Sequence, residues 1–178
     1  MFNILFTQKN NTYKKFNKTD CWDKKRDAKN FDEKNVIIAH PPCRAWATFK
    51  GIAKPEPGEK ELAILAIDVV RKNGGIVEHP SRSSLWKKMR VPRPNEGTDK
   101  FGGFTISIDQ YWFGHRSKKN SWLYIVGIKP DKLPPYPIIL GQAPMKVEKM
   151  GKYERERTPI ELCNWLLEIA NIIKNGKN

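Results

Sequence analysis

Paired cysteines and long apolar runs are both scarce in this sequence. Its three cysteines, Cys21, Cys43 and Cys163, lie far apart, with no Cys-x-x-Cys pair and no histidine at zinc-ligand spacing. We therefore expect neither a disulfide framework nor a bound metal. No apolar run approaches the roughly 18 residues that a membrane span needs, and the first residues carry no basic leader. We expect a soluble cytoplasmic protein with no membrane partner.

Acidic residues are also few relative to basic ones. The 178 residues include 33 Lys and Arg against 19 Asp and Glu, which gives a formal net charge of +14 at pH 7. Such an excess attracts nucleic acids and nucleotides, although it also favours solubility. A chain of this length forms one domain that buries about 70% of its unfolded surface. We expect a single domain with DNA or a nucleotide as partner.

Short apolar segments around a helical pattern indicate an α/β fold. Residues 36–39 and 76–77 are apolar and rich in β-branched side chains, and each is followed within three residues by a proline, which ends a sheet ladder. Between them, residues 59–73 have helical spacing, with acids first and basic residues before Gly74. This order predicts a βαβ unit with two parallel, neighbouring strands.

Four further strands are predicted outside this unit. Residues 3–7 and 20–23 predict two short strands early in the chain. Residues 104–108 and 121–127 predict two more, separated by a basic turn, and such a pair suits the antiparallel edge of a mixed sheet.

Helices and irregular segments are predicted elsewhere. Residues 46–51 predict a brief helix, and the proline-rich residues 130–144 predict an irregular segment. Near the end, Thr158 predicts a helix cap, Pro159 the first helical position and Glu161 the partner in a capping box.

A thiol and a carboxyl group follow the two predicted parallel strands. Because the carboxyl ends of parallel strands meet at one edge, we expect Cys43 and Glu78 to share a crevice. Arg44 and the following turn are expected to lower the pKa of the thiol. Burial at a strand end is expected to raise the pKa of Glu78, which would let it donate a proton. The alternatives are an inert buried cysteine and an exposed acid paired with a lysine.

Basic and aromatic side chains occur near the same loops. Cations contact phosphates, and aromatic rings can stack on bases, each stack contributing on the order of 1–3 kcal/mol. The alternatives are a solvated charge run, core aromatics and histidines that bond loop carbonyls. The candidates for nucleic-acid or nucleotide binding are His40, Arg44, Trp46, His79, Trp112, His115, Lys118 and Lys119, with Arg116 suited to phosphate contact.

The order of these motifs resembles that of cytosine-C5 DNA methyltransferases. The likeness rests on the Pro-Pro-Cys at 41–43, on Glu78, on the basic element at 110–119, and on an Arg-x-x-Thr-x-x-Glu stretch at 155–161. Small phage and prophage proteins classified by that similarity resemble nearly the whole chain, through His-Pro-Pro-Cys, Glu-His-Pro, Trp-Phe-Gly-His and Trp-Leu-Tyr stretches. The resemblance implies a truncated Rossmann-like, methyltransferase-like mixed sheet with flanking helices.

The resemblance also implies a chemistry. Cys43 would attack C6 of a flipped cytosine, Glu78 would hold and protonate the ring at N3, and Arg116 would help anchor the base or its phosphate. Flipping a base costs a few kcal/mol, which aromatic and cationic contacts help to offset. The implied cofactor is S-adenosylmethionine, and the implied setting is a bacterial host cell.

Three motifs depart from the family pattern. The family's glycine-containing loop corresponds to residues 6–10, and this chain has no glycine before Gly51. The family's glutamine after the cysteine is Arg44, and its Glu-Asn-Val is Glu-His-Pro at 78–80. Two other functions therefore stay open. One is a non-catalytic phage protein that sequesters a nucleotide, such as a defence signal, and the other is a different thiol-dependent enzyme that modifies a nucleotide base.

Overall fold

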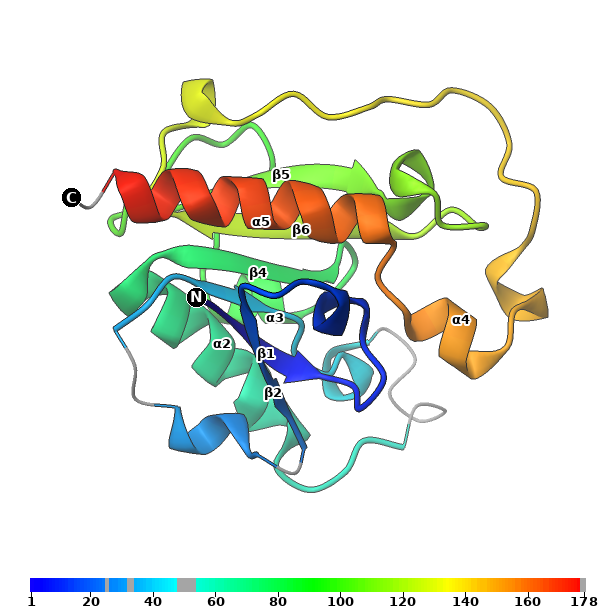
Figure 1. The fold of residues 1–178 in the computed structure, drawn as a ribbon, viewed down its shortest axis with the longest axis horizontal. Coiled ribbons are helices and arrows are strands. Elements are labelled where there is room, and N and C mark those ends of the chain that lie inside the picture. Colours follow the sequence, from blue (N-terminus) through cyan, green and yellow to red (C-terminus); the bar gives the residue numbers. More distant parts are fainter. Residues whose placement is uncertain (25, 32–33, 48–53, 177–178) are drawn as a thin grey trace.

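The computed structural model describes residues 1–24, 26–31, 34–47 and 54–176. A six-stranded mixed sheet forms its centre, with helices on both faces (Figure 1). The strand order is β2-β1-β3-β4-β6-β5. The strands are β1 (Phe2–Thr7), β2 (Thr19–Asp23), β3 (Ile37–Ala39), β4 (Gly75–Pro80), β5 (Phe104–Asp109) and β6 (Asn120–Val126).

Strand directions place most carboxyl ends at one edge of the sheet. β1 runs parallel to β2 and β3, and β3 runs parallel to β4. β6 is antiparallel to both β4 and β5, so β5 points the same way as β4. The predicted βαβ unit and the predicted antiparallel edge are both confirmed. The edge at which β1 to β5 end is called the carboxyl edge below.

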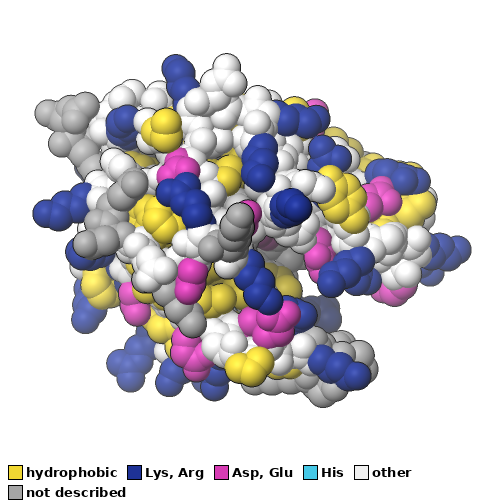
Figure 2. All heavy atoms as spheres, turned by 60° about the horizontal axis from the view of Figure 1, so that its bottom comes forward, with side chains coloured by type: hydrophobic (Ala, Val, Ile, Leu, Met, Phe, Trp, Pro, Cys, Tyr) yellow, Lys and Arg dark blue, Asp and Glu magenta, His cyan; other side chains and the backbone are white. Residues whose placement is uncertain are grey.

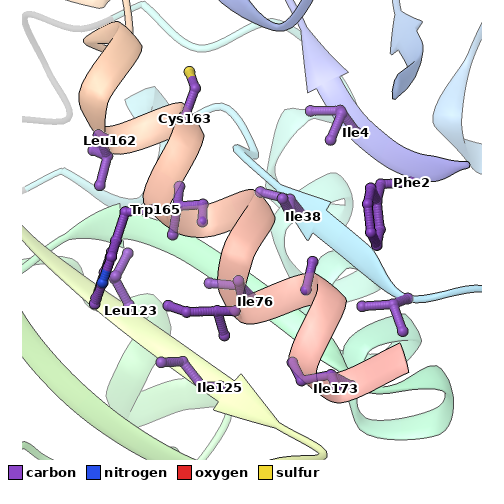
Figure 3. Close-up of a cluster of buried hydrophobic side chains, with 14 of the residues drawn as sticks. Phe2, Ile4, Ile38, Ile76, Leu123, Ile125, Leu162, Cys163, Trp165 and Ile173 are labelled. Carbon is purple, nitrogen blue, oxygen red and sulfur yellow. The ribbon is translucent and has the colours of Figure 1, made fainter. Parts of the chain in front are cut away.

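Two apolar layers hold the sheet between its main helices, α2 (Glu59–Asn73) and α5 (Ile160–Asn175). Successive side chains of a strand point to opposite faces, so Ile76 packs with α5 while Val77 packs with α2. Figure 3 shows the layer under α5, where its side chains face those of β1, β3, β4 and β6. The labelled members are Phe2, Ile4, Ile38, Ile76, Leu123, Ile125, Leu162, Cys163, Trp165 and Ile173.

The ends of the two main helices differ in how well the sequence predicts them. α2 ends at Gly74 with φ 70°, in the left-handed region that favours glycine, as predicted. α5 begins only at Ile160, because Pro159 keeps an extended ψ of 150° and occupies the cap position. The hydroxyl of Thr12 donates to the Thr158 carbonyl at 2.7 Å and holds Thr158 outside the helix. The predicted Thr158 cap and its capping box were therefore wrong.

The remaining elements are single turns or short helices. The predicted helix over 46–51 falls largely outside the described residues, and the short α3 was not predicted. Of the predicted irregular segment 130–144, residues 133–144 form no regular element, as predicted, whereas residues 130–132 form η5. No helix in the described part of the chain has the length and apolar character needed to cross a membrane. These elements are η1 (Thr12–Lys15), η2 (Ala28–Asn30), η3 (Arg44–Trp46), α3 (Leu85–Lys88), η4 (Gln110–Phe113), η5 (Pro130–Lys132), η6 (Val147–Lys149) and α4 (Lys152–Glu156).

Gly75 at the start of β4 tolerates no side chain. Its φ is 141°, and a Cβ there would lie 2.1 Å from the carbonyl oxygen of Ile37 on β3. We expect Gly75→Ala to lower the free energy of unfolding by about 2–6 kcal/mol, from backbone strain and an overpacked contact. Urea unfolding measures this change. Gly97→Ala is the control, since Gly97 also has a positive φ (87°) but open space around it. Equal losses in both variants would mean that the close approach to Ile37 adds nothing to the cost of Gly75→Ala.

Candidate functional site

Two polar side chains extend the α5-facing rows of β3 and β4 at the carboxyl edge. Ile38 and Ile76 are paired neighbours that pack under α5. Two residues further on, His40 and Glu78 lie on the same face, because side chains alternate along a strand. The apolar layer therefore ends in a histidine and a carboxylate that contact each other.

Glu78 is buried, with 8% of its surface exposed, and its carboxylate accepts three hydrogen bonds. Gln110 Nε2 donates to Oε1 at 3.0 Å, and the hydroxyl of Ser121 donates to the same oxygen. His40 Nδ1 lies 3.1 Å from Oε2. Since an ionised carboxylate only accepts, this nitrogen carries a hydrogen. The donors come from the end of β3, from η4 and from β6.

These donors keep the Glu78 carboxyl group ionised. Burial alone would raise the pKa of Glu78, but the hydrogen bond from His40 and the charge of Lys119 outweigh that effect and hold the pKa well below its ordinary value. The expected raised pKa was therefore wrong. At neutral pH, Glu78 accepts hydrogen bonds and has no proton of its own to donate.

A tyrosine continues the chain of hydrogen bonds from Glu78 through His40. His40 Nε2 lies 2.9 Å from the hydroxyl of Tyr13 in η1. Because Nδ1 faces the carboxylate as a donor, Nε2 of a neutral ring accepts from the tyrosine. Burial raises the pKa of Tyr13 well above its ordinary value, so its hydroxyl stays protonated. We call this set the Tyr–His–Glu chain.

Cys43 lies at the same edge with an exposed side chain. Neighbouring atoms shield its sulfur partly from water, and this desolvation, together with the charge of Glu78, raises the pKa of the thiol. Arg44 instead pairs with Glu59 and, at 3.4 Å, with Glu56. The expectation that Arg44 and the following turn lower the thiol's pKa was therefore wrong. Lys119 is the cation whose charge favours the thiolate.

Three predicted binding residues are packed in the interior. The indole N–H of Trp46 donates to the Lys60 carbonyl at 3.2 Å in the layer under α2. His115 lies 2.8 Å from the Ser117 carbonyl through Nδ1. His79 faces the opposite side of the sheet from Glu78, and burial lowers its pKa to about 4. In this conformation none of the three rings is open to a ligand.

The other predicted residues lie around the carboxyl edge. Lys119 is half-buried near Cys43 and Glu78, while Lys118 is exposed. Arg116 is exposed and pairs with Glu154 at 2.9 Å. Trp112 stacks on Tyr136 with their ring centroids 6.3 Å apart, so one of its faces is covered. Figure 2 shows Lys and Arg spread over one face of the molecule, with Asp and Glu among them.

Sequence reasoning missed three members of the site. Tyr13 lies in a polar, lysine-rich stretch, Gln110 was only part of a basic element, and Ser121 was only the start of a strand. No local pattern distinguishes them, because each meets Glu78 or His40 through the folding of distant segments. The pairing of Ser121 with Pro80 across β6 and β4 is the step that brings its hydroxyl to Glu78.

A pocket of about 100 Å³ opens between the carboxyl ends of β1 and β3. Strand order reverses there, which is where open α/β sheets bind ligands. Thr7, Tyr13, His40 and Arg157 are among its lining residues. Phe6, which also lines the pocket, has φ 62°. The volume is below the roughly 300–1,000 Å³ of most small-molecule sites.

The described residues contain no group of three or more His, Cys, Asp or Glu that could hold a metal ion. Comparison with known proteins found no family model that matches the chain and no curated protein that matches it. Function is therefore inferred from the residues at the carboxyl edge.

His79 makes stability depend on pH. Its pKa of about 4 in the folded protein lies below the ordinary value of 6.5, so folding resists its protonation. The contribution of neutral His79 to the free energy of unfolding is fully present above pH 6.5. It falls by about 3 kcal/mol as the pH falls to 4. Urea unfolding of the native protein and of His79→Phe across this range measures the effect. The variant should lack this component, and parallel curves for the two proteins would contradict it.

The three cysteines should differ in reactivity. Iodoacetamide should modify Cys43 first, because Cys43 is exposed, Cys21 is partly buried, and Cys163 is buried with its pKa raised to about 12. The Cys43 rate should still increase above pH 9, since the thiolate is the nucleophile and its pKa is raised. Peptide mass spectrometry at several pH values follows the reaction, with Cys43→Ser as the control. A rate that is already constant between pH 7 and 9 would mean an activated thiol.

Proposed function

We propose that the protein binds a pyrimidine base, in DNA or in a nucleotide, at the carboxyl edge between Cys43 and Glu78. The observation that carries this proposal is an exposed thiol beside a buried, ionised carboxylate at the ends of two parallel strands. A nucleophile and a hydrogen-bond acceptor at one edge of the sheet can contact a planar ring from two sides. The net charge of +14 favours a phosphate-bearing partner.

Glu78 has room for one further donor. A carboxylate has about four acceptor positions, and Gln110, Ser121 and His40 fill three of them. The fourth is on Oε2, and a tenth of the side chain is exposed. The exocyclic amino group of cytosine is a donor that carboxylates accept, whereas thymine has a carbonyl there. Cytosine is therefore the base that this acceptor favours.

The fold supports an ancestry shared with cytosine-C5 DNA methyltransferases and a truncated Rossmann-like sheet. The strand order reverses between β1 and β3, and the candidate residues follow strands at the carboxyl edge, as in doubly wound nucleotide-binding folds. Under this proposal, Cys43 and Glu78 would correspond to the thiol and the carboxylate of the family. Solvent would take the proton of the exposed thiol, and the thiolate would add to C6 of the ring. The electron pair of the C5–C6 double bond would then move to C5, which would take a proton from solvent.

A second candidate is a binder that sequesters a nucleotide without changing it. Two observations favour it over methyl transfer. The pKa of the Cys43 thiol is raised, which leaves little thiolate at neutral pH. The pocket at the strand-order reversal, at about 100 Å³, is also smaller than most small-molecule sites. Both the base-modifying enzyme and the sequestering protein would bind the base. They differ in whether the bound base is chemically changed.

Calorimetry with dCMP, dTMP and dAMP, and with a cytosine-containing oligonucleotide, tests the binding. We expect dCMP to bind best and Glu78→Gln to weaken it about ten- to a hundredfold, the value of a charged hydrogen bond. Glu61→Gln, an exposed change on α2, is the matched control. Circular dichroism verifies that both variants fold. The proposal fails if the native protein binds none of these compounds.

Mass spectrometry of the same compounds distinguishes the two candidates. The native protein is incubated with each compound, with and without S-adenosylmethionine. A chemically changed base identifies an enzyme with a reactive Cys43, and Cys43→Ser should then abolish the change. Recovery of unchanged dCMP from a tight complex identifies a sequestering protein. Because Cys43 is exposed, its replacement by serine should leave folding intact.

A further inference from the structure

Residues 133–146, here called the arm, leave three consecutive large aliphatic side chains in water. The exposed fractions are 64% for Ile138, 43% for Ile139 and 89% for Leu140, and these three residues are called the tip. Figure 1 shows the arm looping outward on its way from η5 to α4. A Cβ added at Gly141 would meet no atom of the described residues within 4 Å beyond its chain neighbours, so the tip stands clear of the body. Contiguous exposed apolar side chains of this kind mark an interaction site.

The first part of the arm is fixed to the core. The Pro134 carbonyl accepts a hydrogen bond of 3.2 Å from the indole of Trp165 on α5. The ring of Tyr136 stacks on Trp112 and lies 5.1 Å from the Trp165 ring, measured between centroids. The chain therefore leaves the body of the protein at Pro137 from a defined position.

The last part of the arm is fixed beside η4 and the turn that follows it. The Tyr111 hydroxyl donates to the Gln142 carbonyl at 3.4 Å, and the Met145 N–H donates to the Arg116 carbonyl at 3.1 Å. With both ends held and several prolines between them, the tip is ordered before any partner arrives. A partner thus loses little free energy in ordering the tip.

The side chains of the tip suit hydrocarbon better than a protein surface. From Pro137 to Gly141 no side chain carries a hydrogen-bonding atom, and residues 133–147 contain no Asp or Glu. Protein interfaces depend on aromatic and arginine side chains and on directional hydrogen bonds, none of which the tip offers. The acyl chains of a lipid bilayer need neither, because they accept aliphatic side chains through the hydrophobic effect alone.

Lysines at the end of the arm that follows the tip supply positive charge. Lys146 comes directly after the hydrogen bond that joins the arm to Arg116, and Lys118 lies two residues beyond Arg116. Lys118, Lys146 and Lys149 are exposed, and none of them forms an ion pair with a described residue. Glu148 is the single acid between the last two of these lysines. Together with the net charge of +14, they attract anionic lipid headgroups.

We propose that Ile138, Ile139 and Leu140 enter the interface of an anionic lipid bilayer, while the lysines behind them contact the headgroups. The side chains would reach the boundary of the acyl chains, roughly 5–10 Å deep. The backbone would stay among the headgroups, because unpaired N–H and C=O groups are costly in hydrocarbon. The sequence prediction of no membrane partner considered a spanning run and a basic leader, and a surface contact of this kind needs neither.

Neither the tip nor the charge is sufficient alone. A single myristoyl chain gives a binding constant of only about 10⁴ M⁻¹, so stable attachment takes two signals. The tip offers an apolar area of similar kind and the lysines offer the second signal. Binding should therefore require anionic lipid, weaken as salt is added, and be reversible.

Flotation with phosphatidylcholine vesicles, with and without anionic phosphatidylglycerol, tests the contact. We expect the native protein to bind the anionic vesicles, and a variant with Ile138→Ser, Ile139→Ser and Leu140→Ser to bind them about tenfold more weakly or worse. The matched control is valine at the same three positions, which keeps the tip aliphatic and should stay within about threefold of the native protein. All three side chains are exposed, so both variants should fold.

A tryptophan placed in the tip distinguishes insertion from adsorption by charge. With anionic vesicles, Leu140→Trp should add a blue-shifted emission that brominated lipid quenches, relative to the native protein with its six tryptophans. Phe101→Trp is the control, since Phe101 is 41% exposed but precedes β5, at its opposite end from η4. Its emission should not change with vesicles.

Four results would overturn the inference. The native protein could fail to bind anionic vesicles, or the serine variant could bind them as well as the native protein, which would mean adsorption by charge alone. The valine variant could lose as much affinity as the serine variant. Lastly, the serine variant could convert a dimer into a monomer with vesicle binding unchanged, which would make the tip a self-association surface. None of these results bears on dCMP binding, so the proposed function is tested separately.

Discussion

A carboxylate removed from water is costly unless donors surround it, and the carboxyl edge of this protein is built around that requirement at Glu78. Its donors come from three different parts of the chain: His40 after β3, Gln110 in η4 and Ser121 in β6. They converge only because β4 lies between β3 and β6. The strand order of the sheet therefore also brings the hydrogen-bond donors to the buried carboxylate of Glu78.

The positions of the strands could be predicted because they depend on local sequence. Apolar runs ended by prolines identified β3 and β4, and the helical pattern between them implied their parallel pairing. The start of α5 could not be predicted in the same way. Thr158 has a side chain suited to capping, but the hydrogen bond from Thr12, far away in the sequence, holds its carbonyl elsewhere.

The sequence predicted the position of the candidate site better than it predicted the pKa shifts of its residues. Cys43 and Glu78 do lie at one edge, yet both pKa directions were wrong, because each depends on groups that folding brings from elsewhere. Proximity in sequence also misled. His79 is adjacent to Glu78, but alternation along the strand turns it to the opposite face, where burial keeps it neutral.

The Tyr–His–Glu chain links two places that a ligand could occupy. The ring of His40 lines the pocket near β1 and also donates to Glu78. Any molecule in that pocket that draws Tyr13 or His40 away must change how firmly the carboxylate is held. If a base binds at Glu78 as proposed, it would by reciprocity change the pocket's affinity for that molecule by the same factor. Ligands at the two places would therefore be thermodynamically coupled through a single imidazole.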